Sequence, residues 1–178
     1  LSPGARQTTP SRQRSAQASV TRRTTTKEQL VQHLFDLATE LGVQVEYTDL
    51  THLGRDGDYN RHTRTIRLQE GMLYRHHRSV LAHEIAHAIA DDETTMFAHI
   101  NERQERRADE WAAHYLIDRD EYQMAERKYG ANIEWIAQEL CVTDELVEAY
   151  ERTLHRVGDS VYVNPKMGAG QWAQKVTA

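Results

Sequence analysis

Cysteine is nearly absent from this sequence, with Cys141 the single one in 178 residues. One cysteine excludes an internal disulfide and any zinc site built from several thiolates, so a metal would be held mainly by histidine and carboxylate side chains. This cysteine usage fits a reducing cytoplasm, where we expect the protein to act. Long apolar runs are also missing: none approaches the roughly 20 residues that cross a bilayer, and no segment resembles a secretory signal.

Acidic residues are missing from residues 1–27, which contain six Arg and Lys side chains. The rest of the chain therefore has 16 basic side chains against 27 acidic ones, a composition poorly suited to binding a phosphate backbone. Residues 1–25 are rich in Ser, Thr, Gln and Arg and show no periodicity. We expect a flexible basic tail there, with an arm that contacts nucleic acid as the alternative.

Hydrophobic periodicity predicts helices and short strands in the rest of the chain. Helical spacing is found at 26–41, 72–90, 101–117, 119–129, 132–140 and 143–154. Alternating patterns indicate strands at 43–50, 58–62, 65–69 and 161–163. This order predicts an α+β fold in which one helix precedes a small antiparallel sheet and the other helices follow. An edge strand of such a sheet could pair with an extended peptide.

The chain is expected to divide into four segments. They are a flexible basic tail at 1–25, a core at 26–118, a helix-turn-helix-like extension packed on the core at 119–156, and a C-terminal tail at 157–178. The second helix of the extension is a poor reader of a DNA groove, because acidic side chains dominate it. The charged residues in question are Asp144, Glu145, Glu148 and Glu151 against Arg152. A helix pair that packs on the core or holds a substrate is therefore favoured over DNA binding.

The strongest chemical signal is the segment His83-Glu84-Ile85-Ala86-His87. Two histidines four residues apart lie on one face of a helix, so both imidazoles can reach one metal ion. Zinc peptidases use the intervening glutamate to take a proton from water at the metal. A random chain of this composition contains the pattern with a probability on the order of 0.05. The segment therefore predicts a zinc-dependent peptidase, although other divalent ions could occupy such a site.

A catalytic zinc ion needs a third protein ligand and an open position for water or substrate. A third histidine at the metzincin spacing is excluded, because Ala90 and Glu93 occupy the positions of the required Gly and His. The remaining candidates are Glu105, His99, Glu102 and the acidic residues 91–93. We expect residues 91–93 to be solvated charge at the end of the motif helix, too close to it to bend back toward the metal.

Glu105 is the best candidate for the third ligand. Glu105 and Asp109 share one face of the next predicted helix, so one carboxylate can bind the metal while the other hydrogen-bonds a ligand histidine. His99 and Glu102 have no helical partner placed like Asp109. A peptidase also benefits from a donor that stabilises the oxyanion of the tetrahedral intermediate. The candidates for that role are His99, His114 and Tyr115.

The segments LAHEIAHAI (81–89) and NERQERRADEWAAHYLI (101–117) resemble the signatures of the ImmA/IrrE family of bacterial and phage metallopeptidases. The second segment resembles the family pattern E-x-x-A-[ND]-x-x-A-A-x-x-L. The resemblance covers roughly residues 27–150. One departure is Ile-Asp at 117–118, where the family often has Met-Pro, and it affects only the local turn.

The resemblance implies a minimal zincin-like domain of the gluzincin type, with one Zn²⁺ per chain held by His83, His87 and Glu105. It also implies that Glu84 is the catalytic general base and that Asp109 orients a ligand histidine. Family members typically cut a helix-turn-helix transcriptional repressor, which relieves repression in a prophage, another mobile element or a stress response. The expected partner is therefore a DNA-binding repressor cleaved at one or few sites, and an acidic body could attract it.

Two rival functions belong to other classes. A regulatory protein could keep zinc for structure and sequester a repressor without cutting it, but a purely structural site has no need of Glu84. A DNA-binding regulator is the second rival, and the acidic extension argues against it. We expect neither a membrane partner nor direct contact with nucleic acid.

Overall fold

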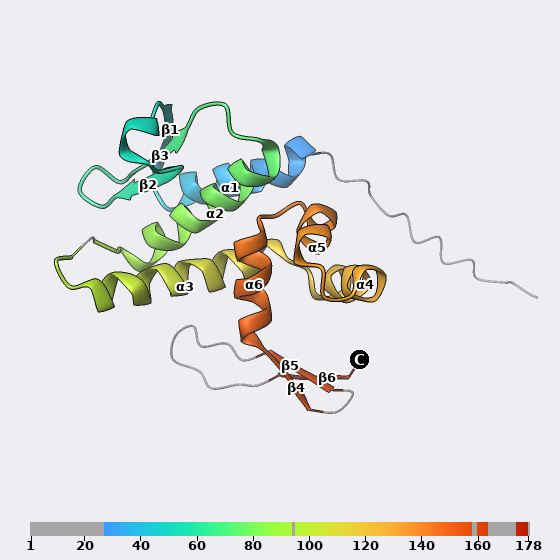
Figure 1. The fold of residues 1–178 in the computed structure, drawn as a ribbon. Helices are drawn as coiled ribbons and strands as arrows, with labels where there is room; N and C mark the ends of the chain where they lie inside the picture. Colours follow the sequence, from blue (N-terminus) through green and yellow to red (C-terminus); the bar gives the residue numbers. More distant parts are fainter. Residues whose placement is uncertain (1–26, 94, 158–159, 164–173, 178) are drawn as a thin grey trace, which may run out of the picture.

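The computed structural model describes residues 27–93, 95–157, 160–163 and 174–177, so the expected tail at 1–25 lies outside the described residues. Figure 1 shows how the elements are arranged. In chain order they are α1 (Lys27–Glu40), β1 (Gln44–Thr48), η1 (Thr51–Leu53), β2 (Gly57–Asn60), β3 (Thr65–Gln69), α2 (Tyr74–Ala90), α3 (Ala98–Leu116), α4 (Arg119–Tyr129), α5 (Ile133–Leu140), α6 (Asp144–Thr153), β4 (Leu154–Val157), β5 (Ser160–Val163) and β6 (Gln174–Thr177). The α+β class expected from the sequence is confirmed.

The first sheet has the strand order β1-β3-β2, which places β2 at an edge. β2 pairs antiparallel with β3, with Gly57 opposite Leu68, as expected. β1 and β3 run parallel, with Gln44 opposite Thr65, so the expectation of an antiparallel sheet is wrong for this pair. The chain leaves β1 through η1, crosses to the far edge as β2, and returns as β3 in the centre. That crossover makes the sheet mixed.

Helices α1 and α2 lie together on one side of this sheet (Figure 1). The core between the helices and the sheet contains apolar side chains from α1, β3 and α2. Its fully buried members include Leu34, Ile66, Leu68, Leu81 and Ile85. Burying one such side chain contributes roughly 1.5–3 kcal/mol. The core therefore fixes α2 against the sheet, and α2 contains the His-Glu-Ile-Ala-His motif.

α3 follows α2 as its neighbour on the other side (Figure 1). Both helices have buried alanines, which include Ala82, Ala88, Ala108, Ala112 and Ala113. Alanine lets two helix backbones approach closely, so side chains from both helices can meet at one point. Ile89, one apolar residue of the motif helix, is instead 45% exposed.

Helices α4, α5 and α6 form a compact group against α2 and α3. Asp118 and Asn132 cap the N-termini of α4 and α5, since each side chain accepts a hydrogen bond from a backbone N–H of its helix. Two buried residues of α2 fix the group in place. The Arg78 guanidinium donates to the carbonyls of Leu140, Cys141 and Leu116, and the Thr143 N–H donates to Ser79 Oγ at 3.0 Å.

A second, antiparallel sheet follows α6, with the strand order β4-β5-β6. β5 lies where the sequence predicts a strand at 161–163. The expected C-terminal tail at 157–178 begins at the last residue of β4 and otherwise contains β5, β6 and residues outside the description. Within the described part of the chain, no helix has both the length and the apolar character needed to cross a membrane.

Candidate metal centre

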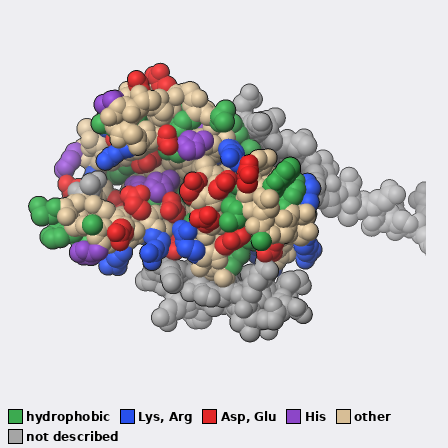
Figure 2. Space-filling model, in the orientation of Figure 1, with side chains coloured by type: hydrophobic (Ala, Val, Ile, Leu, Met, Phe, Trp, Pro, Cys, Tyr) green, Lys and Arg blue, Asp and Glu red, His purple; other side chains and the backbone are tan. Residues whose placement is uncertain are grey.

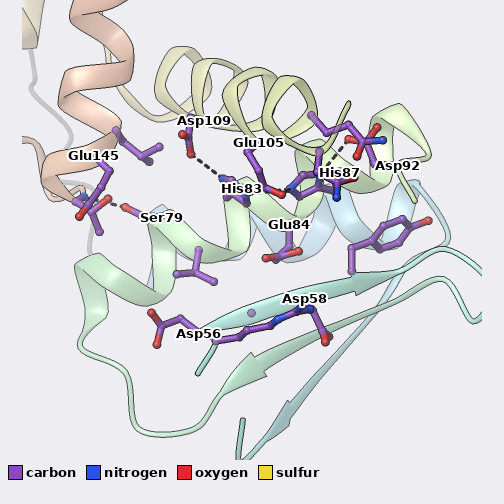
Figure 3. Close-up of a pocket in the computed structure, with 18 of the residues that line it drawn as sticks. Asp56, Asp58, Ser79, His83, Glu84, His87, Asp92, Glu105, Asp109 and Glu145 are labelled. Carbon is purple, nitrogen blue, oxygen red and sulfur yellow. Dashed lines mark hydrogen bonds and ion pairs between the residues drawn. The ribbon is translucent and has the colours of Figure 1, made fainter. Parts of the chain in front are cut away.

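α2 presents three polar side chains of the motif toward α3 and β2. His83 and His87 are one helical turn apart, and their imidazole rings meet edge to face with centroids 4.7 Å apart. Their Nε2 atoms lie 3.0 Å from each other. Glu84 lies on the side of α2 that faces the strand carrying Asp58 (Figure 3). The helical spacing alone accounts for this division of the side chains.

α3 supplies the carboxylates that meet the two histidines. Glu105 Oε2 lies 3.2 Å from His83 Nε2, and Glu105 Oε1 lies 3.7 Å from His87 Nε2. One ligand atom from each of the three side chains can be chosen so that all lie within 4.8 Å of one another. The structure therefore brings His83, His87 and Glu105 together as a group that could hold a metal ion.

The spacing of these donor atoms fits zinc. With Zn–N distances of about 2.0–2.1 Å, tetrahedral ligand atoms are about 3.3 Å apart. Two of the three separations, 3.0 and 3.2 Å, are close to that value, and the third is 3.7 Å. Both histidines also use Nδ1 to contact a carboxylate, which directs Nε2 toward the shared centre. Two imidazoles and one carboxylate suit zinc better than they suit calcium or magnesium.

Asp109 contacts His83, one of the two histidines in the candidate metal group. Its Oδ1 lies 2.9 Å from His83 Nδ1, and the side chain comes from the turn of α3 that follows Glu105. Such a carboxylate fixes the imidazole tautomer and the orientation of the ring. Figure 3 shows Asp109 and Glu105 approaching His83 from the same helix.

Asp92 plays the same part for His87, and the sequence did not indicate it. Asp92 Oδ2 lies 2.9 Å from His87 Nδ1, and the side chain, only 10% exposed, also accepts hydrogen bonds from Arg107. The expectation of solvated charge at 91–93 is therefore wrong for this residue. The reason is the left-handed conformation of Asp91 (φ 53°), which turns the chain so that the Asp92 N–H donates to His87 O.

The charges of the centre are strongly coupled when no metal is bound. Burial would lower the pKa of His83, but hydrogen bonds to Asp109 and Glu105 outweigh it and raise that pKa to about 10. The same contacts with His83 and His87 hold the pKa of the Glu105 carboxyl far below its usual range. A metal ion would compete with protons for the same lone pairs, so its binding to this group would depend on pH.

Glu84 has the environment of a general base. Its side chain is only 7% exposed, and burial raises its pKa to about 7, although His83 and His87 act in the opposite direction. A carboxylate with a pKa near neutrality can both accept a proton and release it. Glu84 therefore differs electrostatically from Glu105, although both line the same cavity.

The centre opens into a cavity of about 620 Å³. Figure 2 shows histidine side chains inside a hollow, with acidic side chains around them. The walls come from β2 and the turn before it, from α2, from α3 with the segment before it, and from the N-terminal end of α6. Thr143, the N-cap of α6, lines the cavity together with Glu145 and Leu146 of the first turn. The helical extension therefore forms part of the cavity wall.

The three residues considered for oxyanion stabilisation are not among those lining the cavity. The His114 ring packs against Tyr150, Tyr115 stacks on Trp111, and His99 lies beside Phe97. The polar side chains that do line the cavity near the metal group include Tyr59, His76, Asn101 and Gln104. Tyr59 lies on β2, and Asn101 and Gln104 lie on α3, so their approach to α2 depends on the tertiary fold and no local pattern indicated them. His76 lies on α2 itself, two turns before His83.

This fold and this arrangement of motif residues define a protein of the metallopeptidase type. Residues 32–150 match the family model of peptidase M78, described as the IrrE N-terminal-like domain. The match covers more than half of the chain, and the chain belongs to this family. The family resemblance drawn from residues 81–89 and 101–117 is thereby confirmed.

A solved structure supports the fold. The chain is similar to a Mycobacterium tuberculosis transcriptional regulator, with a TM-score of 0.52 and 18% sequence identity over 76% of this chain and 44% of that one. The chain thus spans less than half the length of that regulator. No curated protein matches the sequence.

Proposed function

We propose that the protein is a zinc-dependent endopeptidase in which His83, His87 and Glu105 bind the metal and Glu84 is the general base. The observation that carries this proposal is the pairing of a convergent donor group with a buried, separate carboxylate in one cavity. Glu105 is held ionised by the two histidines, whereas the pKa of Glu84 is about 7. Two carboxylates with such different protonation behaviour suit two different roles, ligand and base.

The mechanism assigns one task to each side chain. Zinc, when bound, supplies a Lewis acid that acidifies water and polarises a carbonyl group. Glu84 takes the proton from the attacking water and passes it to the leaving amine. Asp109 and Asp92 keep the Nδ1 atoms of His83 and His87 engaged, so that both Nε2 atoms stay available to the metal.

Substrate access is proposed to occur along β2. This strand lies at the edge of the sheet and contributes Gly57, Asp58 and Tyr59 to the cavity lining. An extended peptide can add to an exposed strand edge through main-chain hydrogen bonds. The peptide would then run between β2 and the ends of α3 and α6, across the metal group.

The proposed substrate is a helix-turn-helix transcriptional repressor, cut at one or few sites to relieve repression. Membership of the family supports a regulatory metallopeptidase. The excess of acidic side chains outside the first 27 residues also favours a basic partner. The solved regulator of similar fold is a protein of transcriptional control by its name, which agrees with this setting.

The test is incubation of the purified protein with the repressor encoded beside its own gene. Zinc, manganese and chelator arms are run in parallel, and intact mass spectrometry reads the products. We expect one metal-dependent cut that yields two fragments whose masses sum to the repressor plus one water. A repressor that co-purifies uncut would instead support the sequestering protein, and a repressor neither bound nor cut would contradict the proposed substrate.

A further inference from the structure

Gly57 occupies a position in β2 at which the backbone conformation does not require glycine. The positive-φ glycines among the described residues are Gly42, Gly54, Gly71 and Gly130, and Gly57 is not one of them. Glycine within a strand weakens it, because it costs backbone entropy and supplies no side chain to pack. Gly57 is the first residue of β2, and one reason for glycine in a strand is the close approach of another element.

That element is α2, at the turn that carries Glu84. A Cβ atom built at residue 57 would lie 2.7 Å from Val80 Cγ1 and 3.1 Å from both Cγ and Oε1 of Glu84. Carbon atoms in favourable contact are about 3.5–4.0 Å apart, so even a methyl group has no room here. The edge strand can lie this close to Glu84 only because residue 57 has no side chain.

We propose that Gly57 is a positioning residue for the general base: its missing side chain lets β2 lie against α2 and leaves the Glu84 carboxylate its place beside the metal group. This inference rests on the proposed role of Glu84. Glu84 is only 7% exposed, and Gly57, Val80 and Glu84 all line the cavity, so a displaced carboxylate would have little free space except toward the site of reaction. Contacts of 3.1 Å require the Glu84 side chain to give way by a few tenths of an ångström, and such a displacement would change the hydrogen bonds that Glu84 makes to a bound ligand.

The two contacts of the missing Cβ can be separated by mutation. Gly57→Ala creates both the contact with Val80 and the contacts with Glu84. Val80→Ala removes Cγ1, so in that background Gly57→Ala loses the 2.7 Å contact and keeps the two 3.1 Å contacts with Glu84. Comparing the double variant with Val80→Ala, and Gly57→Ala with the wild type, gives a cycle in which the effect of Val80 itself cancels.

The probe is acetohydroxamate, which chelates zinc and hydrogen-bonds to a carboxylate beside it. Its affinity is measured on the zinc-loaded full chain, together with zinc affinity and Tm. We expect Gly57→Ala to weaken hydroxamate binding about tenfold, the size of one lost charge-assisted hydrogen bond, with zinc affinity unchanged. Tm should fall by about 3–10 °C, as for overpacking by one methyl group in a chain of this length.

In the Val80→Ala background, Gly57→Ala should lower Tm by less than it does in the wild type. It should still weaken hydroxamate binding by the same factor. Gly71→Ala is the control: residue 71 has a positive φ of 75° and open space around it, so alanine there lowers Tm without contacting Glu84. Its hydroxamate affinity should equal that of the wild type. If Gly57→Ala does not fold, the double variant carries the measurement.

Two results would overturn the inference. One is wild-type hydroxamate affinity in Gly57→Ala. The other is a double variant whose hydroxamate affinity and Tm both equal those of Val80→Ala. That result would show that Gly57 matters only for the packing of β2 against Val80. Failure of the proposed function is recognised separately: Glu84→Ala would then bind zinc and hydroxamate as well as the wild type does.

Discussion

Burial of the Glu84 carboxylate, which is only 7% exposed, lowers the stability of the folded protein near neutral pH. Its pKa is raised to about 7 by burial, so the folded protein holds its proton at pH values where the unfolded chain has already lost it. Between those two pKa values the free energy of unfolding falls as the pH rises. The same desolvation brings the pKa of Glu84 close to neutral pH, which suits the proposed role of a group that takes and returns a proton.

Glu84→Gln should therefore stabilise the metal-free protein in a pH-dependent way. Glutamine cannot ionise, so the variant escapes the penalty that the wild type acquires between about pH 4.5 and 7. At pH 8 we expect a gain of about 3 kcal/mol in the free energy of unfolding. Urea denaturation of both proteins in chelator, at pH 4.5 and pH 8, measures it. A difference that stays constant with pH would contradict the raised pKa.

The carboxylates behind the two histidines should determine metal affinity. Asp92→Asn replaces the charged partner of His87 Nδ1 and should weaken zinc binding by about 10–100-fold. Asp91→Asn is the matched control, because asparagine also tolerates the left-handed conformation at that turn and the side chain contacts Arg61 rather than a ligand. Competition with a chromophoric chelator measures both affinities. Equal affinities in the two variants would show that Asp92 does not orient His87.

At the level of the elements, α2 joins the parts of the molecule. Its apolar side packs on the sheet and α1, its alanines admit α3, and Arg78 and Ser79 fix the ends of α3 and α5 and the start of α6. The helix that carries the motif therefore contacts the sheet, α3 and the helical extension, which are the elements that form the cavity walls. A rigid support of this kind keeps the reacting groups at fixed positions.

Arg78→Ala should destabilise the protein by about 3 kcal/mol or more, because it leaves the carbonyls of Leu116, Leu140 and Cys141 buried without their donor. Arg75→Ala, one turn earlier on the same helix, removes a 3.7 Å ion pair with Asp144 between side chains that are 35% and 42% exposed, and should cost about 1 kcal/mol or less. Chemical denaturation of the two variants gives both values. Similar losses would contradict the role of Arg78 as the connection between α2 and the helical extension.

The sequence predicted most elements, because their patterns are local. The helix at 119–129 coincides with α4, and the motif helix and the helix of Glu105 agree with α2 and α3 within a few residues. The direction of β1 against β3 was missed, because strand pairing between distant segments leaves no local pattern. Asp92 was missed for a similar reason: its contact with His87 depends on one left-handed residue, and aspartate gives no strong signal for that conformation.

At the level of the whole molecule, metal binding should be visible as stability. A ligand that binds only the folded state at 100 times its Kd contributes about 2.7 kcal/mol, which corresponds to about 5–10 °C in Tm for a chain of this length. We expect zinc to raise Tm and a chelator to reverse the change. Glu105→Ala should lose most of this shift, and differential scanning calorimetry of the two proteins tests it. A full shift in Glu105→Ala would remove Glu105 from the ligand set.

The helical extension forms one wall of the cavity beside the metal group, since Thr143, Glu145 and Leu146 line that cavity. α6 packs its apolar side inward, with Leu146, Val147 and Tyr150 buried, and exposes acidic residues. Such a helix is suited to holding a substrate beside the metal group and poorly suited to a DNA groove. The helix-turn-helix-like pattern in the sequence is thus better explained by packing than by DNA recognition.

The most direct measurement is cleavage of the repressor by wild type and Glu84→Gln, with bound zinc determined for each protein. The account predicts one zinc ion per chain in both, a single cut by the wild type, and a rate at least about 100-fold lower for Glu84→Gln. That result would separate metal binding from catalysis and assign the proton transfer to Glu84. Equal cleavage by the two proteins, or loss of zinc from Glu84→Gln, would contradict the central claim.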